Sequence, residues 1–279
     1  MDFLATIGES KLYNFHSHTQ FCDGRATMEM FASEVVAQGF THYGFSPHSP
    51  IPVESSCNMH LCDVPTYIEE VTRIKETYGD KTKFYASMEI DYLGKNWGPA
   101  HEYFQNLPLD YRIGSIHFIP SQNGEIIDID GSFENFDRKM ERYFNSDIRY
   151  VVETYYAHAI EMVNTGGFDL IGHFDKIGNN ASHYCPGIED ESWYQALVGD
   201  LIDAIIAKKL TVEINTKAWD KHNRFFPHSR YWQRLVKEQV PIIINSDAHY
   251  PHLINANREE AHSLLKSQEH YLNKKVVKV

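Results

Sequence analysis

The sequence is poor in cysteine and has no long hydrophobic run. Its four cysteines (Cys22, Cys57, Cys62 and Cys185) form no CxxC pair. A chain of 279 residues can bury a core large enough to fold without disulfides. This cysteine usage favours a cytoplasmic protein with reduced thiols over a secreted, disulfide-stapled one.

Membrane and export signals are also missing from the sequence. No apolar run approaches the roughly 18 residues that a membrane span requires. The opening stretch MDFLATIGESKLYNF lacks the basic start and the apolar segment of a signal peptide. We therefore expect no membrane partner and no secretion.

Positive charge is in deficit, with 26 Lys and Arg against 38 Asp and Glu and a net charge of −12. Nucleic-acid binding depends mainly on Lys and Arg that neutralise phosphates, so this balance argues against a nucleic-acid partner. A small phosphorylated molecule is not excluded, because bound divalent metals would add positive charge.

No repeat of fixed period and no linker rich in Gly, Ser or Pro divides the chain, so we expect one domain over residues 1–279.

Seven short apolar segments, bounded by Gly, Pro or polar residues, are typical of strands buried on both faces. They cover residues 12–15, 41–45, 83–90, 112–118, 169–174, 211–215 and 241–245. Helical periodicity lies between them at 27–38, 65–78 and 193–208, and over 133–163 as one long helix or two consecutive ones. The alternation predicts an α/β fold with a parallel sheet, and seven units fit a closed TIM-like barrel better than an open sheet.

Residue types that bind metals stand at the end of nearly every predicted strand, where such barrels place their active sites. In chain order they are His16, His18, Asp23, His48, Glu89, His117, His173, Asp247 and His249. Imidazoles and carboxylates bind Zn, Mn or Fe, and the absence of thiolates from the set favours a catalytic over a closed structural site. Since alternate residues of a strand point to the same side, His16 and His18 can reach one ion.

A single histidine at a strand end is more often a hydrogen-bonded core or surface residue than a ligand, so the prediction depends on the whole constellation. For the remaining histidines we favour a non-ligand role, with some allowance for His222 and His228 in the loop after the sixth strand. Glu213 lies within that strand. We expect it to be a satisfied acid inside the barrel or a hydrogen-bond partner of a metal ligand.

The motifs HSHTQFCDG, SPHSP, MEIDY, GSIHF, GHFDK, EINT and NSDAH follow one another in this order. In order and spacing they resemble the PHP (polymerase and histidinol phosphatase) family of metal-dependent phosphoesterases, and within it the histidinol-phosphatase branch. The resemblance covers essentially the whole chain. It implies a distorted (β/α)7 barrel with a metal centre at the C-terminal ends of the strands.

The resemblance also implies which residues would bind three ions, which could be Zn, Fe or Mn. The first ion would be held by His16, His18, Glu89 and Asp247. The second would share Glu89 as a bridge and add His117 and His173. The third would be held by Asp23, His48 and His249.

Two stretches depart from the family's pattern. SPHSP lacks the aspartate that many relatives carry before the histidine, which alters the surroundings of this ligand but not the ligand itself. After EINT the sequence continues KAWDKHNRFF, where related phosphatases often have a small residue or glycine. This loop would border the substrate, so we expect it to bear on specificity.

The activity that the resemblance implies is hydrolysis of L-histidinol phosphate to L-histidinol and phosphate, a step of histidine biosynthesis, by attack of a metal-bound hydroxide. Asp247 or His249 would orient the attacking water or protonate the leaving alkoxide. Arg224, Lys176 and Arg25 are candidates to bind the substrate phosphate, although an exposed cation is usually only solvated. Two alternatives stay open: another small phosphoester or a nucleotide as substrate, and a non-catalytic accessory module that binds metal.

Overall fold

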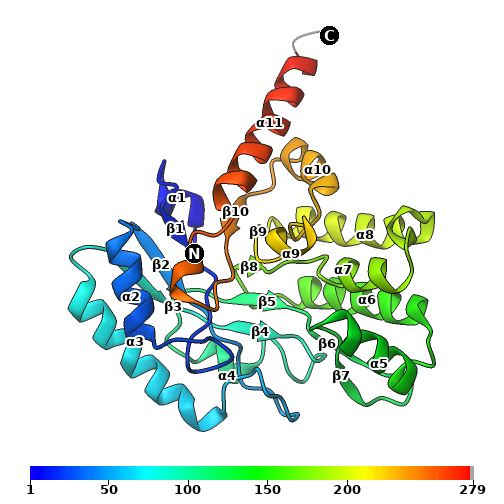
Figure 1. Ribbon diagram of the computed structural model, residues 1–279, viewed down its shortest axis with the longest axis horizontal. Helices are drawn as coiled ribbons and strands as arrows, with labels where there is room; N and C mark the ends of the chain where they lie inside the picture. Colours follow the sequence, from blue (N-terminus) through cyan, green and yellow to red (C-terminus); the bar gives the residue numbers. More distant parts are fainter. Residues whose placement is uncertain (277–279) are drawn as a thin grey trace.

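Short parallel strands form a ring in the computed structural model, which describes residues 1–276 (Figure 1). Hydrogen bonds join them in the orders β1-β2-β3 and β10-β9-β8-β5-β4. The strands are β1 (Tyr13–Asn14), β2 (His42–Phe45), β3 (Lys83–Ala86), β4 (Glu89–Asp91), β5 (Ile113–Ser115), β8 (Leu170–Ile171), β9 (Thr211–Asn215) and β10 (Ile242–Asn245).

Two parallel bridges close this ring. β3 and β4 are one strand interrupted at residues 87–88, and a bridge between His48 and Glu89 joins the extension of β2 to β4. On the other side, a bridge between Ser17 and Ala248 joins the continuations of β1 and β10. The predicted α/β barrel with seven parallel strand positions is confirmed, with its third strand in two pieces.

Helices cover the outside of the ring. In Figure 1, α2 (Met28–Ala37) and α3 (Val64–Tyr78) lie beside β2 and β3, whereas α6 (Ile148–Thr165) and α8 (Ser192–Lys208) pack together on the opposite side. α10 (Trp232–Lys237) packs on α11 (Arg258–Val276), which extends away from the barrel. The shorter helices are α1 (Phe3–Ile7), α4 (Glu102–Gln105), α5 (Phe133–Tyr143), α7 (Ile177–Tyr184) and α9 (Trp219–His222), with 3-10 turns at Leu61–Asp63, Ile188–Asp190, Ser229–Tyr231 and Pro251–Leu253.

The predicted helices at 27–38, 65–78 and 193–208 correspond to α2, α3 and α8. The segment 133–163 forms two helices, α5 and α6. Asn145 and Ser146 between them have φ angles of 49° and 59°, a left-handed conformation that cannot continue a helix.

The fourth predicted strand, 112–118, is shorter than expected. β5 ends at Ser115, and the chain then enters an antiparallel hairpin of β6 (Phe118–Pro120) and β7 (Ile126–Asp128). Because the apolar run continues from one strand into the next, hydrophobicity alone does not mark the boundary. His117 therefore lies between two strands, at the mouth of the barrel.

Aromatic side chains close the end of the barrel that faces away from the strands' C-terminal ends. Phe3 of α1 packs edge-on against Phe15 and Tyr111, at centroid distances of 5.1 and 5.3 Å. The Tyr111 hydroxyl donates to the Phe15 carbonyl at 2.5 Å. This apolar plug leaves the opposite end of the barrel to polar side chains.

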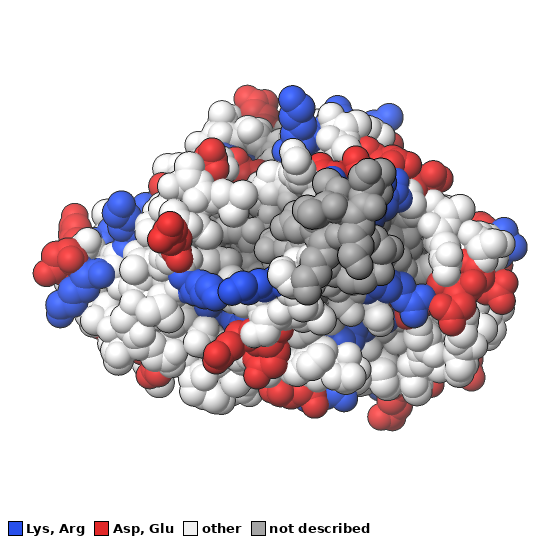
Figure 2. Space-filling view, turned by 90° about the horizontal axis from the view of Figure 1, so that it is seen from above, with Lys and Arg blue, Asp and Glu red and all other residues white. Residues whose placement is uncertain are grey.

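Charged residues of both signs are interspersed on the face shown in Figure 2, where Lys and Arg lie among Asp and Glu. Within residues 1–276, no helix combines the length and the apolar character needed to cross a bilayer. All four cysteines are free. That residues 1–279 form a single domain stays a prediction.

Candidate metal centre

The predicted ligands converge at one end of the barrel. His16 and His18 follow β1, His173 follows β8, and Asp247 and His249 follow β10. Seven of the nine are buried, and Asp23 and His249 are half-buried. The ring of strands thus brings together residues that are up to 233 positions apart, from His16 to His249.

Ligand atoms of these residues form four overlapping groups, each with its atoms within 4.8 Å of one another. The groups are His18, Asp23, His48 and His249; His16, His18 and Glu89; His48, Glu89 and His117; and His16, His173 and Asp247. The three residues expected at the third ion lie in one group, which also contains His18. How the ligands divide among individual ions stays a prediction.

Glu89 lies at the centre of the cluster and is 1% exposed. Its Oε1 is 2.7 Å from His173 Nε2 and 3.5 Å from His117 Nε2. Its Oε2 is 3.1 Å from His48 Nδ1 and 3.2 Å from His16 Nε2. A carboxylate with imidazole nitrogens at both oxygens has the arrangement expected of a bridging ligand.

In the part of the chain that the structure describes, several donor atoms of the cluster are buried and make no hydrogen bond of acceptable geometry, whereas most buried polar atoms in proteins make one. They are His16 Nε2, His18 Nε2, His48 Nδ1, Asp23 Oδ1 and Glu89 Oε2. A compact set of unpaired nitrogen and oxygen donors is suited to divalent cations. The residues present therefore fit a metal cluster.

Carboxylates behind the cluster orient two of the imidazoles. His16 Nδ1 lies 2.7 Å from Glu213 Oε1, and His117 Nδ1 lies 2.8 Å from Asp91 Oδ1. Each contact engages the nitrogen that faces away from Glu89, so that Nε2 is left for the cluster. Glu213 meets both expectations: it is fully buried with both oxygens hydrogen-bonded, and one of its partners is the predicted ligand His16.

The electrostatics of the cluster keep its carboxylates charged. Burial opposes ionisation of Asp247, yet Lys217 and His16 lower its pKa well below the ordinary value. Burial likewise opposes charge on His16, but Glu213, Glu89 and Asp247 raise its pKa well above the ordinary value. The buried carboxylates are thus ionised and draw positive charge toward them, and bound cations would supply such charge.

Lys217 also lies at this end of the barrel, although no motif of the sequence indicates a role for it. Its Nζ lies 3.1 Å from His249 Nε2 and 3.5 Å from Asp247 Oδ1, and its side chain is 41% exposed. Lys217 is the first residue of KAWDKHNRFF, the loop that departs from the family's pattern. Its position two residues after the end of β9 is the feature of the sequence that could have placed Lys217 near the metal ligands.

Two of the three predicted phosphate-binding cations lie near the donor cluster. Lys176 Nζ is 2.7 Å from Asp130 Oδ2 and 3.3 Å from His117 Nε2. Arg25 has an exposed side chain, and its backbone N–H donates to the His249 carbonyl at 2.8 Å. Their contact with a phosphate stays a prediction.

Arg224, the third candidate, is buried and paired with two carboxylates. Its two terminal nitrogens lie 2.7 Å from Glu189 Oε1 and 2.9 Å from Asp175 Oδ2. Burial raises the pKa of Asp175 to about 6, although Arg224 opposes this shift. Because both terminal nitrogens of the guanidinium already bind carboxylates, its contacts favour a structural role, and phosphate binding by Arg224 stays a prediction.

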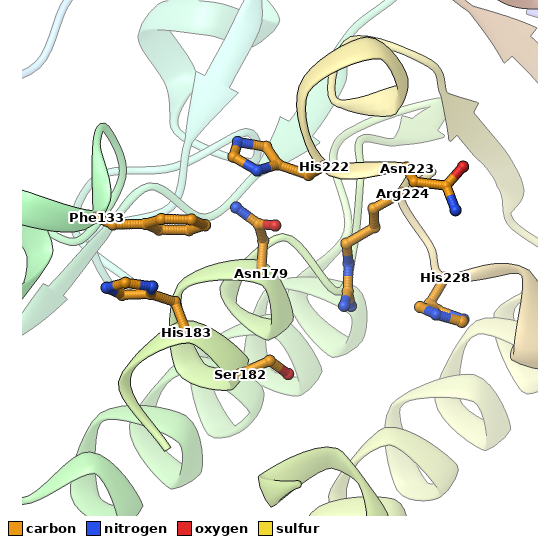
Figure 3. A pocket seen from close by; sticks show the side chains of 8 residues that line it. All are labelled: Phe133, Asn179, Ser182, His183, His222, Asn223, Arg224 and His228. Atoms are coloured by element: carbon orange, nitrogen blue, oxygen red, sulfur yellow. The ribbon is translucent and has the colours of Figure 1, made fainter. Parts of the chain in front are cut away.

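A cavity of about 300 Å³ lies over Arg224 (Figure 3). Its walls come from α5, α7 and the loop after β9. The lining residues are Phe133, Asn179, Ser182, His183, His222, Asn223, Arg224 and His228. His222 and His228, the two histidines set apart in the sequence, thus border a cavity and lie outside the donor groups.

A PHP domain model matches residues 14–217, which is more than half of the chain. The chain therefore belongs to the PHP domain family. Together with the barrel and its donor cluster, this defines a PHP-family phosphoesterase.

Within the family, the chain is related to histidinol-phosphatases. It is 27% identical over 270 residues to the "probable histidinol-phosphatase" of Schizosaccharomyces pombe, covering 90% of this chain and 84% of that protein. It is 24% identical over 252 residues to the protein of the same name from Deinococcus radiodurans, covering 86% and 87%.

Solved structures share the fold. HisK from Listeria monocytogenes matches with a TM-score of 0.77 at 18% identity, over 89% of this chain and 99% of that one. Histidinol phosphate phosphatase from Lactococcus lactis, solved with Zn, L-histidinol and phosphate, matches with a TM-score of 0.66 at 17% identity, over 92% and 94%.

Proposed function

We propose that this chain is a metal-dependent phosphomonoesterase that hydrolyses L-histidinol phosphate to L-histidinol and phosphate, in histidine biosynthesis. The observation that supports it is the convergence of six imidazoles and three carboxylates at the barrel mouth, with unpaired donor atoms among them. The relationship to histidinol-phosphatases supports the choice of substrate.

We propose that the nine predicted ligands hold three divalent ions of Zn, Fe or Mn, since nitrogen and oxygen donors accept several metals. Such ions, when bound, lower the pKa of a water and offset charge on phosphoryl oxygens. The chain itself positions the ligands for these ions. Glu89 connects the imidazoles of four strands, and Glu213 and Asp91 fix the orientation of His16 and His117.

We propose that two lysines hold the phosphoryl group, whose charge is spread over three oxygens. Lys217 lies beside His249, and Lys176 lies beside His117. A phosphate at the donor cluster could therefore accept hydrogen bonds from cations at two of its oxygens. Asp247 and His249 remain the candidates for orienting the water or protonating the leaving alkoxide.

The test is phosphate release from three substrates by protein that is purified with its metals retained. The substrates are L-histidinol phosphate, p-nitrophenyl phosphate and a dinucleotide, and the metal content is measured in parallel. We expect the highest kcat/KM for L-histidinol phosphate, and a Glu89→Gln variant should lose both activity and bound metal. Rapid cleavage of another ester without release from L-histidinol phosphate would contradict the proposed substrate.

A further inference from the structure

Asp130 is a carboxylate at the mouth of the barrel that does not belong to the donor groups. It follows β7, in the hairpin that separates His117 from α5. Its Oδ2 lies 2.7 Å from Lys176 Nζ, and the side chains of the two residues are 38% and 13% exposed. Because Lys176 is largely shielded from water, this ion pair is screened less than a surface pair.

The backbone around Asp130 is held by three hydrogen bonds. The Ile129 N–H donates to the His117 carbonyl at 2.9 Å, and the Asn180 amide of α7 donates to the Ile129 carbonyl at 3.1 Å. The Asp130 N–H donates to Asp128 Oδ1 at 2.8 Å. The Asp130 carboxylate therefore has a defined place beside His117 and α7.

Lys176 lies between Asp130 and the donor cluster. Its Nζ is 3.3 Å from His117 Nε2, and this nitrogen is 3.5 Å from Glu89 Oε1. Burial opposes charge on this ammonium, but the carboxylates of Asp130, Asp247 and Glu89 raise its pKa above the ordinary value, so it stays a cation. The ammonium is thus attracted in two directions, by Asp130 at the rim and by the carboxylates of the cluster.

The position of this ammonium has opposite consequences for phosphate and for metal. At the rim, paired with Asp130, it can donate to an oxygen of a phosphate that binds at the cluster. Displaced toward Glu89, it would place a positive charge beside His117 Nε2, where it repels a divalent ion. Asp130 opposes this displacement, because it offers a counter-charge outside the cluster.

We propose that Asp130 is the positioning residue of Lys176: it holds the ammonium at the rim of the cluster, facing the substrate phosphate, and keeps it out of the space for a metal ion beside His117. This inference rests on the proposed function, in which His117 binds metal and Lys176 binds phosphate. Loss of the Asp130 charge should therefore weaken the binding of both metal and phosphate. The effect on metal requires that Lys176 is present.

The experiment is a double-mutant cycle of Asp130→Asn and Lys176→Met, with Zn affinity measured by chelator competition. We expect Asp130→Asn to weaken the binding of at least one Zn ion about tenfold or more, because Lys176 then moves toward the cluster. Lys176→Met should bind Zn at least as tightly as the wild type. The double variant should match Lys176→Met within about threefold, a rescue that a merely structural role of Asp130 would not produce.

Inorganic phosphate is the second probe, titrated calorimetrically into Zn-saturated protein. Asp130→Asn and Lys176→Met should each weaken phosphate binding at least about fivefold, and the double variant should bind phosphate no more weakly than Lys176→Met. Asp128→Asn is the matched control in the same hairpin, because Asp128 pairs with Lys139 Nζ at 3.0 Å and the amide keeps an oxygen for the Asp130 N–H. This control should match the wild type for Zn and for phosphate.

Wild-type affinity of Asp130→Asn for Zn or for phosphate, or a loss of Zn affinity that persists when Lys176 is also replaced, overturns the proposal. Weaker Zn binding by Lys176→Met than by the wild type also overturns it, and this result does not depend on the folding of Asp130→Asn. Both affinities are measured without turnover. A wild type that releases no phosphate from L-histidinol phosphate contradicts the proposed function, and the binding comparison still decides the role of Asp130.

Discussion

His16 holds its Nδ1 2.7 Å from Oε1 of Glu213, deep inside the barrel. Both side chains are fully buried, and Glu213 also accepts hydrogen bonds from the His173 backbone and from the Asn245 amide. One carboxylate therefore orients residues from three different strands. It contacts the donor cluster from behind, through His16 and His173.

We expect Glu213→Gln to weaken metal binding about 10- to 100-fold, because the variant loses the charge that fixes His16. Chelator competition with metal analysis measures this affinity. Glu191→Gln, at an exposed position, is the control and should retain wild-type affinity. Wild-type metal affinity in Glu213→Gln would show that the contact does not support the metal centre.

Lys217→Met should weaken inhibition by inorganic phosphate. A hydrogen bond to a charged group contributes about 1.5–3 kcal/mol, so the inhibition constant should rise about tenfold or more. Metal content should stay unchanged. Lys221→Met, an exposed lysine of the same loop, provides the matched comparison. Equal inhibition constants for the two variants would remove Lys217 from the phosphate site.

Arg224→Ala should destabilise the fold, because it leaves Asp175 and Glu189 buried without their cation. Loss of one partner from a buried ion pair typically costs about 3–5 kcal/mol in the free energy of unfolding. Denaturant unfolding measures this loss. Arg230→Ala, which breaks a surface pair, should change stability by no more than about 1 kcal/mol. An equally small effect of Arg224→Ala, with a raised KM for every phosphoester, would favour phosphate binding by Arg224.

Removal of metal should lower both activity and thermal stability. Without cations the ionised carboxylates of Glu89 and Asp247 remain crowded in a buried space. An ion present at 100 times its dissociation constant stabilises the folded state by about 2.7 kcal/mol. Melting curves with chelator, and then with Zn, Mn or Fe restored, test this. A Tm that is unaffected by verified loss of metal would contradict the proposed metal centre.

Much of the fold was predictable because the signals are local. β10 is a run of three isoleucines between Pro241 and Asn245, and α2 begins after Thr27, whose side chain caps Met30 N at 3.3 Å. The β6–β7 hairpin was missed because its apolar residues continue the pattern of β5. Periodicity detects elements more reliably than it locates the turns between them.

The sequence by itself determined the alternation of strands and helices and the metal-binding residue types at the strand ends, since these depend on neighbours along the chain. Only the tertiary structure decided that Arg224 lies between Asp175 and Glu189, and that Lys217 lies beside His249. No local pattern records such contacts, because they arise when ring closure brings separate loops together. A buried charge such as that of Arg224 requires a partner of opposite sign, whereas the partly exposed Lys217 can also bind a ligand.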